Sequence, residues 1–115
     1  MWGFSPDVEH VSAEEAIALS TGESILLDVR ERWEYDLGHA PSARNLPMSE
    51  LDERVSEIDA DATVLVVCHS GQRSLSVTAA LGRAGITALN VDGGMLAWQA
   101  AGGVVVAEGD QLPRV

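Results

Sequence analysis

Cys68 is the only cysteine of the chain, and it opens the segment Cys-His-Ser-Gly-Gln-Arg-Ser that ends at Ser74. The thiolate is the nucleophilic form of cysteine, and it is favoured by a nearby cation and by converging amide groups. Arg73 supplies a permanent cation, and Gly71 lets the backbone curl so that amides can point inward. We therefore predict a nucleophilic Cys68 that works with Arg73 and titrates below the reference thiol pKa of about 8.5. The expected anion-binding loop consists of His69, Ser70, Gly71, Gln72 and Ser74.

The alternative for Cys68 is a structural role as a small buried hydrophobe, because free cysteines are among the most buried residue types. A lone cysteine cannot form an internal disulfide or a four-cysteine zinc site. The three histidines of the chain show no metal-ligand spacing with it. We therefore predict no metal and no cofactor.

The elements around Cys68 follow from the apolar runs of the chain. Ile25–Leu27 and Val64–Val67 are continuously apolar, and Ala88–Val91 is a weaker run, which predicts strands covered on both faces. Helical stretches separate these runs, and parallel strands need such crossovers. The chain is therefore predicted to be an α/β protein with a parallel sheet and helices on both faces. Cys68 directly follows Val64–Val67, so it lies at the carboxyl edge, before a helix expected from about Ser74 whose positive dipole end favours an anion.

The remaining segments follow from capping and turn residues. Ser12 and Glu15 have the spacing of a capping box, which predicts a helix to about Leu19. The segment Val104–Val115 fits either an added edge strand or a frayed tail. Other expected helices cover Glu31–Leu37, Ser49–Ile58, the stretch from Ser74 to before Gly85, and Gly94–Ala101, with turns or loops at Gly38–Pro41 and Asn45–Pro47.

The 115 residues fit one domain, and an apolar fraction of 46% supports a core at that size. Eighteen carboxylates against seven basic residues give a formal charge of −11. That charge repels phosphate backbones and anionic lipid, so nucleic acid and membrane surfaces are excluded as expected partners. No apolar run approaches the ~20 residues of a spanning helix, and the first ten residues lack the pattern of a signal peptide, so we expect a cytoplasmic location.

Three segments carry motifs. Ile25–Pro47 contains Asp-Val-Arg-Glu and Gly-His-Ala-Pro, Val67–Ser74 contains the cysteine loop, and Asp92–Trp98 reads Asp-Gly-Gly-Met-Leu-Ala-Trp. Together these segments resemble the single-domain rhodanese family. The resemblance covers about residues 8–103 and leaves 104–115 as a C-terminal extension. It implies a five-stranded parallel sheet and a loop whose cysteine carries a persulfide during sulfur transfer.

The family's second motif usually reads Gly-His-Ile-Pro-Gly-Ala, whereas Ala40 and Ser42 replace its isoleucine and second glycine here. These changes concern packing and turn geometry more than chemistry.

The resemblance implies a two-step reaction at Cys68. Its thiolate takes the sulfane sulfur of a donor such as thiosulfate or a persulfide, and an external thiol, cyanide or a protein thiol then accepts that sulfur. Two alternatives stay open: a persulfide-carrying or regulatory binding module with little thiosulfate turnover, and a small cysteine phosphatase. The phosphatase is disfavoured because four residues separate Cys68 from Arg73, where phosphatase loops have five, and Val67 replaces the usual preceding histidine.

For the other polar residues near these motifs we expect structural or supporting roles. Asp28 and Arg30 follow a predicted strand at the same edge as Cys68. We expect Asp28 to make structural hydrogen bonds, while contact with substrate and a purely structural role stay open for Arg30. Glu34 is expected to be an ion-pair partner on a helix surface, and His39 to fix its turn by a hydrogen bond. His69 is expected to affect acceptor entry rather than to act as an acid or base.

Overall fold

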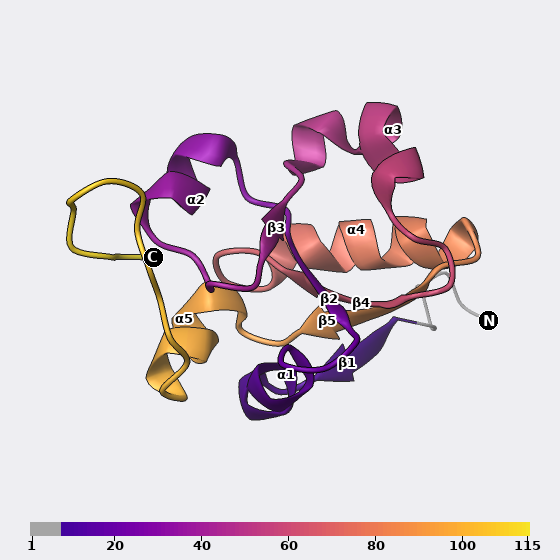
Figure 1. Cartoon of the computed structure of the whole chain (residues 1–115). Helices are drawn as coiled ribbons and strands as arrows, with labels where there is room; N and C mark the ends of the chain where they lie inside the picture. The colour runs from indigo at the N-terminus through magenta and orange to yellow at the C-terminus, as the bar shows by residue number, and fades with distance from the viewer. Residues whose placement is uncertain (1–7) are drawn as a thin grey trace.

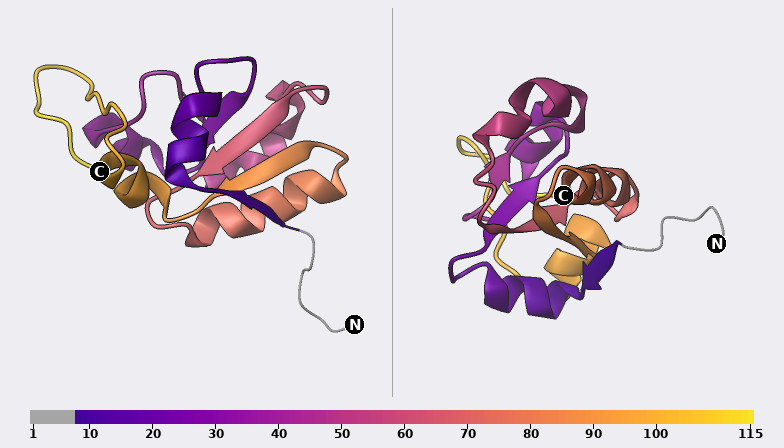
Figure 2. Two further views of the ribbon diagram at one scale, coloured as in Figure 1. Left: turned by 90° about the horizontal axis from the view of Figure 1, so that it is seen from below. Right: turned by 90° about the vertical axis from the view of Figure 1, so that its right-hand side faces the viewer.

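A computed structural model describes residues 8–115, which form a parallel five-stranded sheet with helices on both faces (Figures 1 and 2). The strand order is β1-β5-β4-β2-β3, and every pairing between these strands is parallel. The predicted fold class is thus confirmed. The strands are β1 (Glu9–Val11), β2 (Ile25–Asp28), β3 (Arg44–Asn45), β4 (Thr63–Val67) and β5 (Thr87–Val91).

The two edge strands were not predicted from the residues. β1 has the sequence Glu-His-Val, and β3 has only two residues, Arg44 and Asn45, so neither contains an apolar run. The prediction that Asn45 begins a turn was therefore wrong. Asn45 pairs with Asp28 of β2, and its side-chain amide donates to the Asp28 and Arg30 carbonyls at 3.0 and 2.9 Å. These edge strands form because each pairs with a neighbouring strand. The pattern of apolar residues within one segment does not indicate such pairing.

The helices agree with the prediction except in two places. The segment expected as one helix over Ser49–Ile58 is divided, because Glu50 and Arg54 leave helical geometry with ψ values of 6° and 4°. α4 begins at Gln72, earlier than expected, because Gly71 adopts a left-handed φ of 104° and serves as its N-cap. The helices are α1 (Ala13–Leu19), α2 (Arg32–Leu37), α3 (Leu51–Arg54), α4 (Gln72–Arg83) and α5 (Gly94–Ala100), with single 3₁₀ turns at Met48–Glu50 and Val55–Glu57.

Strand β4 supplies the centre of two apolar layers. Val64, Val66 and Cys68 belong to the layer that includes Val77 and Leu81 of α4. The intervening Leu65 and Val67 belong to the layer under α1 and α5, because side chains alternate across a strand. Figure 2 shows α1 and α4 on opposite faces of the sheet. The alternation therefore places Cys68 directly after the four buried residues Val64–Val67, on the face that α4 covers.

The capping box predicted at the start of α1 is present. The Glu15 amide donates to the Ser12 hydroxyl oxygen at 3.1 Å, and the Ser12 amide donates to the Glu15 carboxylate at 2.9 Å. No helix within residues 8–115 combines the length and the apolar character needed to cross a membrane.

The segment Val104–Val115 is neither of the two forms considered for it. It adds no strand to the sheet, and its only bridge is a single antiparallel pairing of Val106 with His39. It is also fixed by backbone hydrogen bonds at several points along its length. In Figure 1 it forms the yellow loop that returns to the body of the protein near α2.

Candidate active site

Cys68 lies directly after β4 and is 1% exposed. Its sulfur is the focus of the loop that follows. The Gly71 amide donates to Sγ at 3.1 Å and the Ser74 amide donates at 3.4 Å. The thiol also lies 3.3 Å from the Ser74 hydroxyl, which can donate to a thiolate. The loop and the first turn of α4 therefore direct several donors at the sulfur atom, an arrangement that suits an anion.

Two glycines explain how the loop reaches this shape. Gly71 has a φ of 104°, a backbone angle that residues other than glycine rarely adopt. Gly94 lets α5 approach the loop, because a side-chain carbon there would collide with the Cys68 carbonyl oxygen. Across this close contact the Met95 amide donates to the Cys68 carbonyl at 2.8 Å, and the Leu96 amide donates to the His69 carbonyl at 3.1 Å. The start of α5 thus binds two carbonyl groups of the loop.

Burial has the largest influence on the pKa of the Cys68 thiol, and by itself it raises that pKa. Hydrogen bonds from the Ser74 hydroxyl and from the amides of Ser74, Gly71 and Ser70 favour the thiolate and together outweigh burial. The pKa of Cys68 is therefore lowered, in the direction that the sequence predicted. The cation of Arg73 is not among these leading contributions, so the backbone and Ser74 do most of the stabilisation.

Arg73 forms a two-point ion pair with Glu34 of α2. Its Nη1 and Nη2 donate to the two carboxylate oxygens at 2.7 and 2.9 Å. The hydrogen bonds from Arg73 lower the pKa of Glu34, and the same contacts raise the pKa of Arg73. Because the folded carboxyl pKa is lowered, this stabilisation is complete above the ordinary carboxyl pKa and is lost as pH falls through the lowered value.

The ion pair ties α2 to Arg73 in the first turn of α4, across 39 residues of sequence. We expected a partner for Glu34 on a helix surface, and the sequence did not indicate that this partner is the loop arginine. No spacing rule connects residues on different elements, so only the folded structure shows that Glu34 belongs to the site.

Asp28 and Arg30 form a second ion pair, which is completely buried. The Arg30 Nη2 donates to an Asp28 carboxylate oxygen at 2.7 Å and to the Gly38 carbonyl at 2.7 Å. The exposed fractions of the two side chains are 1% for Arg30 and 0% for Asp28. This geometry agrees with the structural role expected for Asp28. Arg30 is held in the same network and also lines a pocket at the site.

That pocket has a volume of about 240 Å³ and lies beside the cysteine loop. Its lining residues are Arg30, Trp33, Glu34, Leu37, His69 and Val115. A larger pocket of about 470 Å³ lies between β1, α4 and β5, but it contains none of the predicted site residues.

The other predicted loop residues differ in their exposure to solvent. Ser70 and Gln72 are exposed, and His69 is partly buried. His39 lies outside the loop, and its Nδ1 is 2.7 Å from the Tyr35 carbonyl, which agrees with its predicted role in fixing the turn. Among residues 8–115, no three His, Cys, Asp and Glu side chains are grouped as metal ligands would be.

Residues 12–101 match the family model described as a rhodanese-like domain. A sulfurtransferase from Allochromatium vinosum is 35% identical over 102 residues, which cover 88% of this chain and 94% of that protein. An HTH-type transcriptional regulator from Mycobacterium tuberculosis is 34% identical over 92% of this chain, which spans only 50% of the regulator.

A similar structure is the crystal structure of a rhodanese-related protein from Thermoplasma volcanium. It has a TM-score of 0.82 and 30% identity, and the match covers 87% of this chain and 99% of that one.

Proposed function

The chain belongs to the rhodanese-like domain family, and from this membership we propose that it is a sulfurtransferase in which Cys68 carries the transferred sulfur as a persulfide. Sulfur transfer in general is supported by the family and by the sulfurtransferase among its relatives. The observation that carries the proposal for Cys68 is the convergence of the Gly71 and Ser74 amides on its sulfur.

In the first half-reaction, the Cys68 thiolate attacks the outer sulfur of a small donor, for which thiosulfate is the simplest example. A new S–S bond forms, the S–S bond of thiosulfate breaks, and sulfite leaves with the electron pair. The product is an anionic cysteine persulfide. The loop amides and the Ser74 hydroxyl stabilise the thiolate before attack and offer donors to the negative sulfur afterwards.

In the second half-reaction, an acceptor nucleophile attacks the outer sulfur of the persulfide. Cyanide, a small thiol or a protein thiol meets this requirement. The persulfide S–S bond breaks and its electron pair returns to Cys68 as the thiolate. Because the chain has one cysteine, no second thiol within it can take the sulfur. The acceptor is therefore external, and the two substrates react in a ping-pong order.

Arg73 has a supporting role in this proposal. It adds positive charge beside the loop, which favours an anionic donor, but Glu34 shares that charge through their ion pair. Asp28 and Arg30 support the wall of the site through their buried ion pair.

The second candidate is a persulfide-carrying or regulatory module with little thiosulfate turnover. It is favoured by the similarity to half of a transcriptional regulator. Both candidates require a persulfide on Cys68, and they differ in how quickly an acceptor removes it.

The test is intact-mass measurement after incubation with thiosulfate, compared with Cys68→Ser. Sulfurtransfer predicts one added sulfur atom in the wild type, none in Cys68→Ser, and loss of the added mass when cyanide is supplied. Serine is close to cysteine in size, so the variant keeps the fold and removes the thiolate. An unmodified wild type after treatment with thiosulfate and with an organic persulfide contradicts the proposal, while a persulfide that no acceptor removes favours the carrier module.

A further inference from the structure

The pocket beside the cysteine loop has one wall from outside the matched family region. The family model ends at residue 101, whereas Val115 lines the pocket together with Trp33 and Leu37 of α2. This wall therefore comes from residues 104–115, which the family model does not include.

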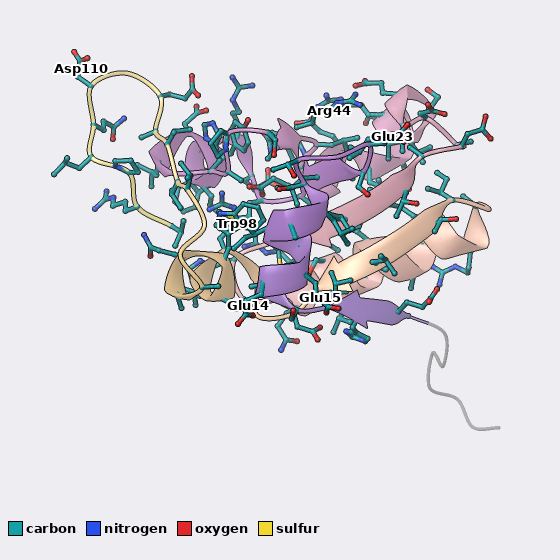
Figure 3. All side chains as sticks on the ribbon, turned by 60° about the horizontal axis from the view of Figure 1, so that its bottom comes forward. Glu14, Glu15, Glu23, Arg44, Trp98 and Asp110 are labelled. Carbon is teal, nitrogen blue, oxygen red and sulfur yellow. The ribbon has the colours of Figure 1, made fainter. Side chains whose placement is uncertain are left out.

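The segment is fixed at both of its ends. Near its start, the Trp98 Nε1 donates to the Val104 carbonyl at 3.0 Å, and the Val106 and His39 backbones exchange two hydrogen bonds of 2.8 Å. Near its end, the Arg114 amide donates to the Leu37 carbonyl at 2.9 Å. Between these contacts the chain loops outward, with Asp110 at the outer bend in Figure 3.

Close packing adds to these hydrogen bonds. A side-chain carbon at Gly38 would collide with the backbone of Arg114, and one at Gly103 would collide with the indole ring of Trp98. Val105 and Val115 pack against the core layer that contains Trp98. The position of Val115 is therefore set by the body of the protein, so it can act as a fixed wall.

The charged side chains that line the pocket, those of Arg30 and Glu34, are already paired. Arg30 is bound to Asp28, and the Glu34 carboxylate is bound to Arg73. The remaining walls include the apolar side chains of Trp33, Leu37 and Val115, of which Trp33 is 67% exposed. A pocket of this composition favours an uncharged apolar group over a free anion.

The size of the pocket limits that group. A volume of about 240 Å³ lies below the roughly 300–1,000 Å³ typical of sites for drug-sized ligands. It suits the carbon skeleton of a small thiol whose sulfur points toward the cysteine loop, where His69 forms part of the lining.

We propose that this pocket binds the apolar carbon skeleton of a small thiol substrate next to Cys68, and that Val115 sets the largest skeleton that fits. The thiol is an acceptor of the sulfur or, as its persulfide, a donor. This inference rests on the proposed sulfur transfer for its biological meaning. The shape of the pocket can nevertheless be tested without turnover.

The first experiment measures access to the thiol. The only cysteine is alkylated with iodoacetamide, which is compact, and with N-phenylmaleimide, which is bulky and apolar. The variants are Val115→Phe, which fills the pocket, and Val115→Ala, which enlarges it. Leu112→Ala is the matched control, because Leu112 belongs to the same segment and is 89% exposed.

Val115→Phe should lower the N-phenylmaleimide rate relative to the iodoacetamide rate by about tenfold, since small changes in apolar volume commonly discriminate by that factor or more. Val115→Ala should raise the same ratio, and Leu112→Ala should leave it unchanged. The proposal is wrong if both Val115 variants keep the wild-type ratio or if Leu112→Ala changes it equally. Using one filling and one enlarging variant keeps the test decisive if either fails to fold.

The second experiment links the pocket to sulfur transfer. Wild type loaded with persulfide is given cyanide or 2-phenylethanethiol as acceptor, and the ratio of their kcat/KM values is compared with that of Val115→Phe. The variant should lose about tenfold with the aromatic thiol and little with cyanide. An unchanged ratio in active protein refutes the pocket and leaves sulfur transfer intact. If no persulfide forms, the function is refuted, and the alkylation ratios still decide the pocket.

Discussion

Replacing Ser74 with alanine separates the hydroxyl contribution to the Cys68 thiolate from the backbone contribution. The Ser74 hydroxyl is buried and lies 3.3 Å from the sulfur, and it is the leading influence that lowers the thiol pKa after burial has raised it. Ser74→Ala removes this donor but keeps the Ser74 amide, which also donates to the sulfur. The thiol pKa of the variant should therefore rise.

The size of the effect follows from the strength of a hydrogen bond to a charged group. Such bonds contribute about 1.5–3 kcal/mol, and the contact of Ser74 with sulfur is placed at the lower limit because sulfur is a weaker hydrogen-bond acceptor than oxygen. About 1.4 kcal/mol corresponds to a tenfold change in equilibrium, so the thiolate fraction in acidic solution should fall about tenfold. A more basic thiolate is also more nucleophilic, so the net rate there should fall by about three- to fourfold.

The assay is the pH dependence of iodoacetamide alkylation at this only cysteine. The wild-type inflection should lie below the ordinary thiol pKa, and Ser74→Ala should move it to higher pH. The variant should react more slowly below the inflection and somewhat faster on the alkaline plateau. Ser70→Ala is the control, because it alters an exposed side chain in the same loop and keeps its amide.

A general disruption of the loop would lower the rate at every pH, which distinguishes it from a pKa change. If the inflection of Ser74→Ala coincides with that of the wild type, the hydroxyl does not stabilise the thiolate. If the wild-type inflection lies at or above the ordinary thiol value, Cys68 is instead a buried structural residue.

Three further predictions concern the cation, the reaction and the fold. Arg73→Ala should lower thiosulfate turnover by about tenfold or more in steady-state assays, and Arg73→Lys should restore only part of it because lysine lacks the planar fork that binds Glu34; unchanged kinetics in both would remove the cation from the mechanism. Aryl phosphate hydrolysis should be negligible, and phosphate release comparable to sulfur transfer that disappears in Cys68→Ser would revive the phosphatase. Asp28→Ala should destabilise the protein by about 3–5 kcal/mol in urea unfolding, because it leaves the Arg30 charge buried without its partner; a loss below 1 kcal/mol would show that water or another group compensates.

The residue patterns determined the central part of this protein. Continuous apolar runs defined β2, β4 and β5, and the position of Cys68 directly after such a run placed it at the carboxyl edge of a parallel sheet. The capping residues Ser12 and Glu15 defined the start of α1. These features are local, so neighbouring residues in the chain are sufficient to specify them. The loop after Cys68 was similarly apparent, because its glycine and hydroxyl residues are consecutive.

The edge strands and the walls of the site depended on the tertiary structure. β3 exists because Asn45 pairs with β2, and the Glu34–Arg73 ion pair joins residues 39 positions apart. Neither relation has a periodic signature, because the partners lie on different elements and meet only after the chain has folded.

The same reason applies to the segment of residues 104–115. Its composition left an edge strand and a frayed tail equally open, whereas contacts with Gly38 and Trp98 fix it beside the pocket. The sequence alone therefore predicts the Cys68 sulfur as the nucleophile. Only tertiary packing decided which residues, Val115 among them, surround the approach to it, because a wall is made by elements that the chain brings together from distant positions.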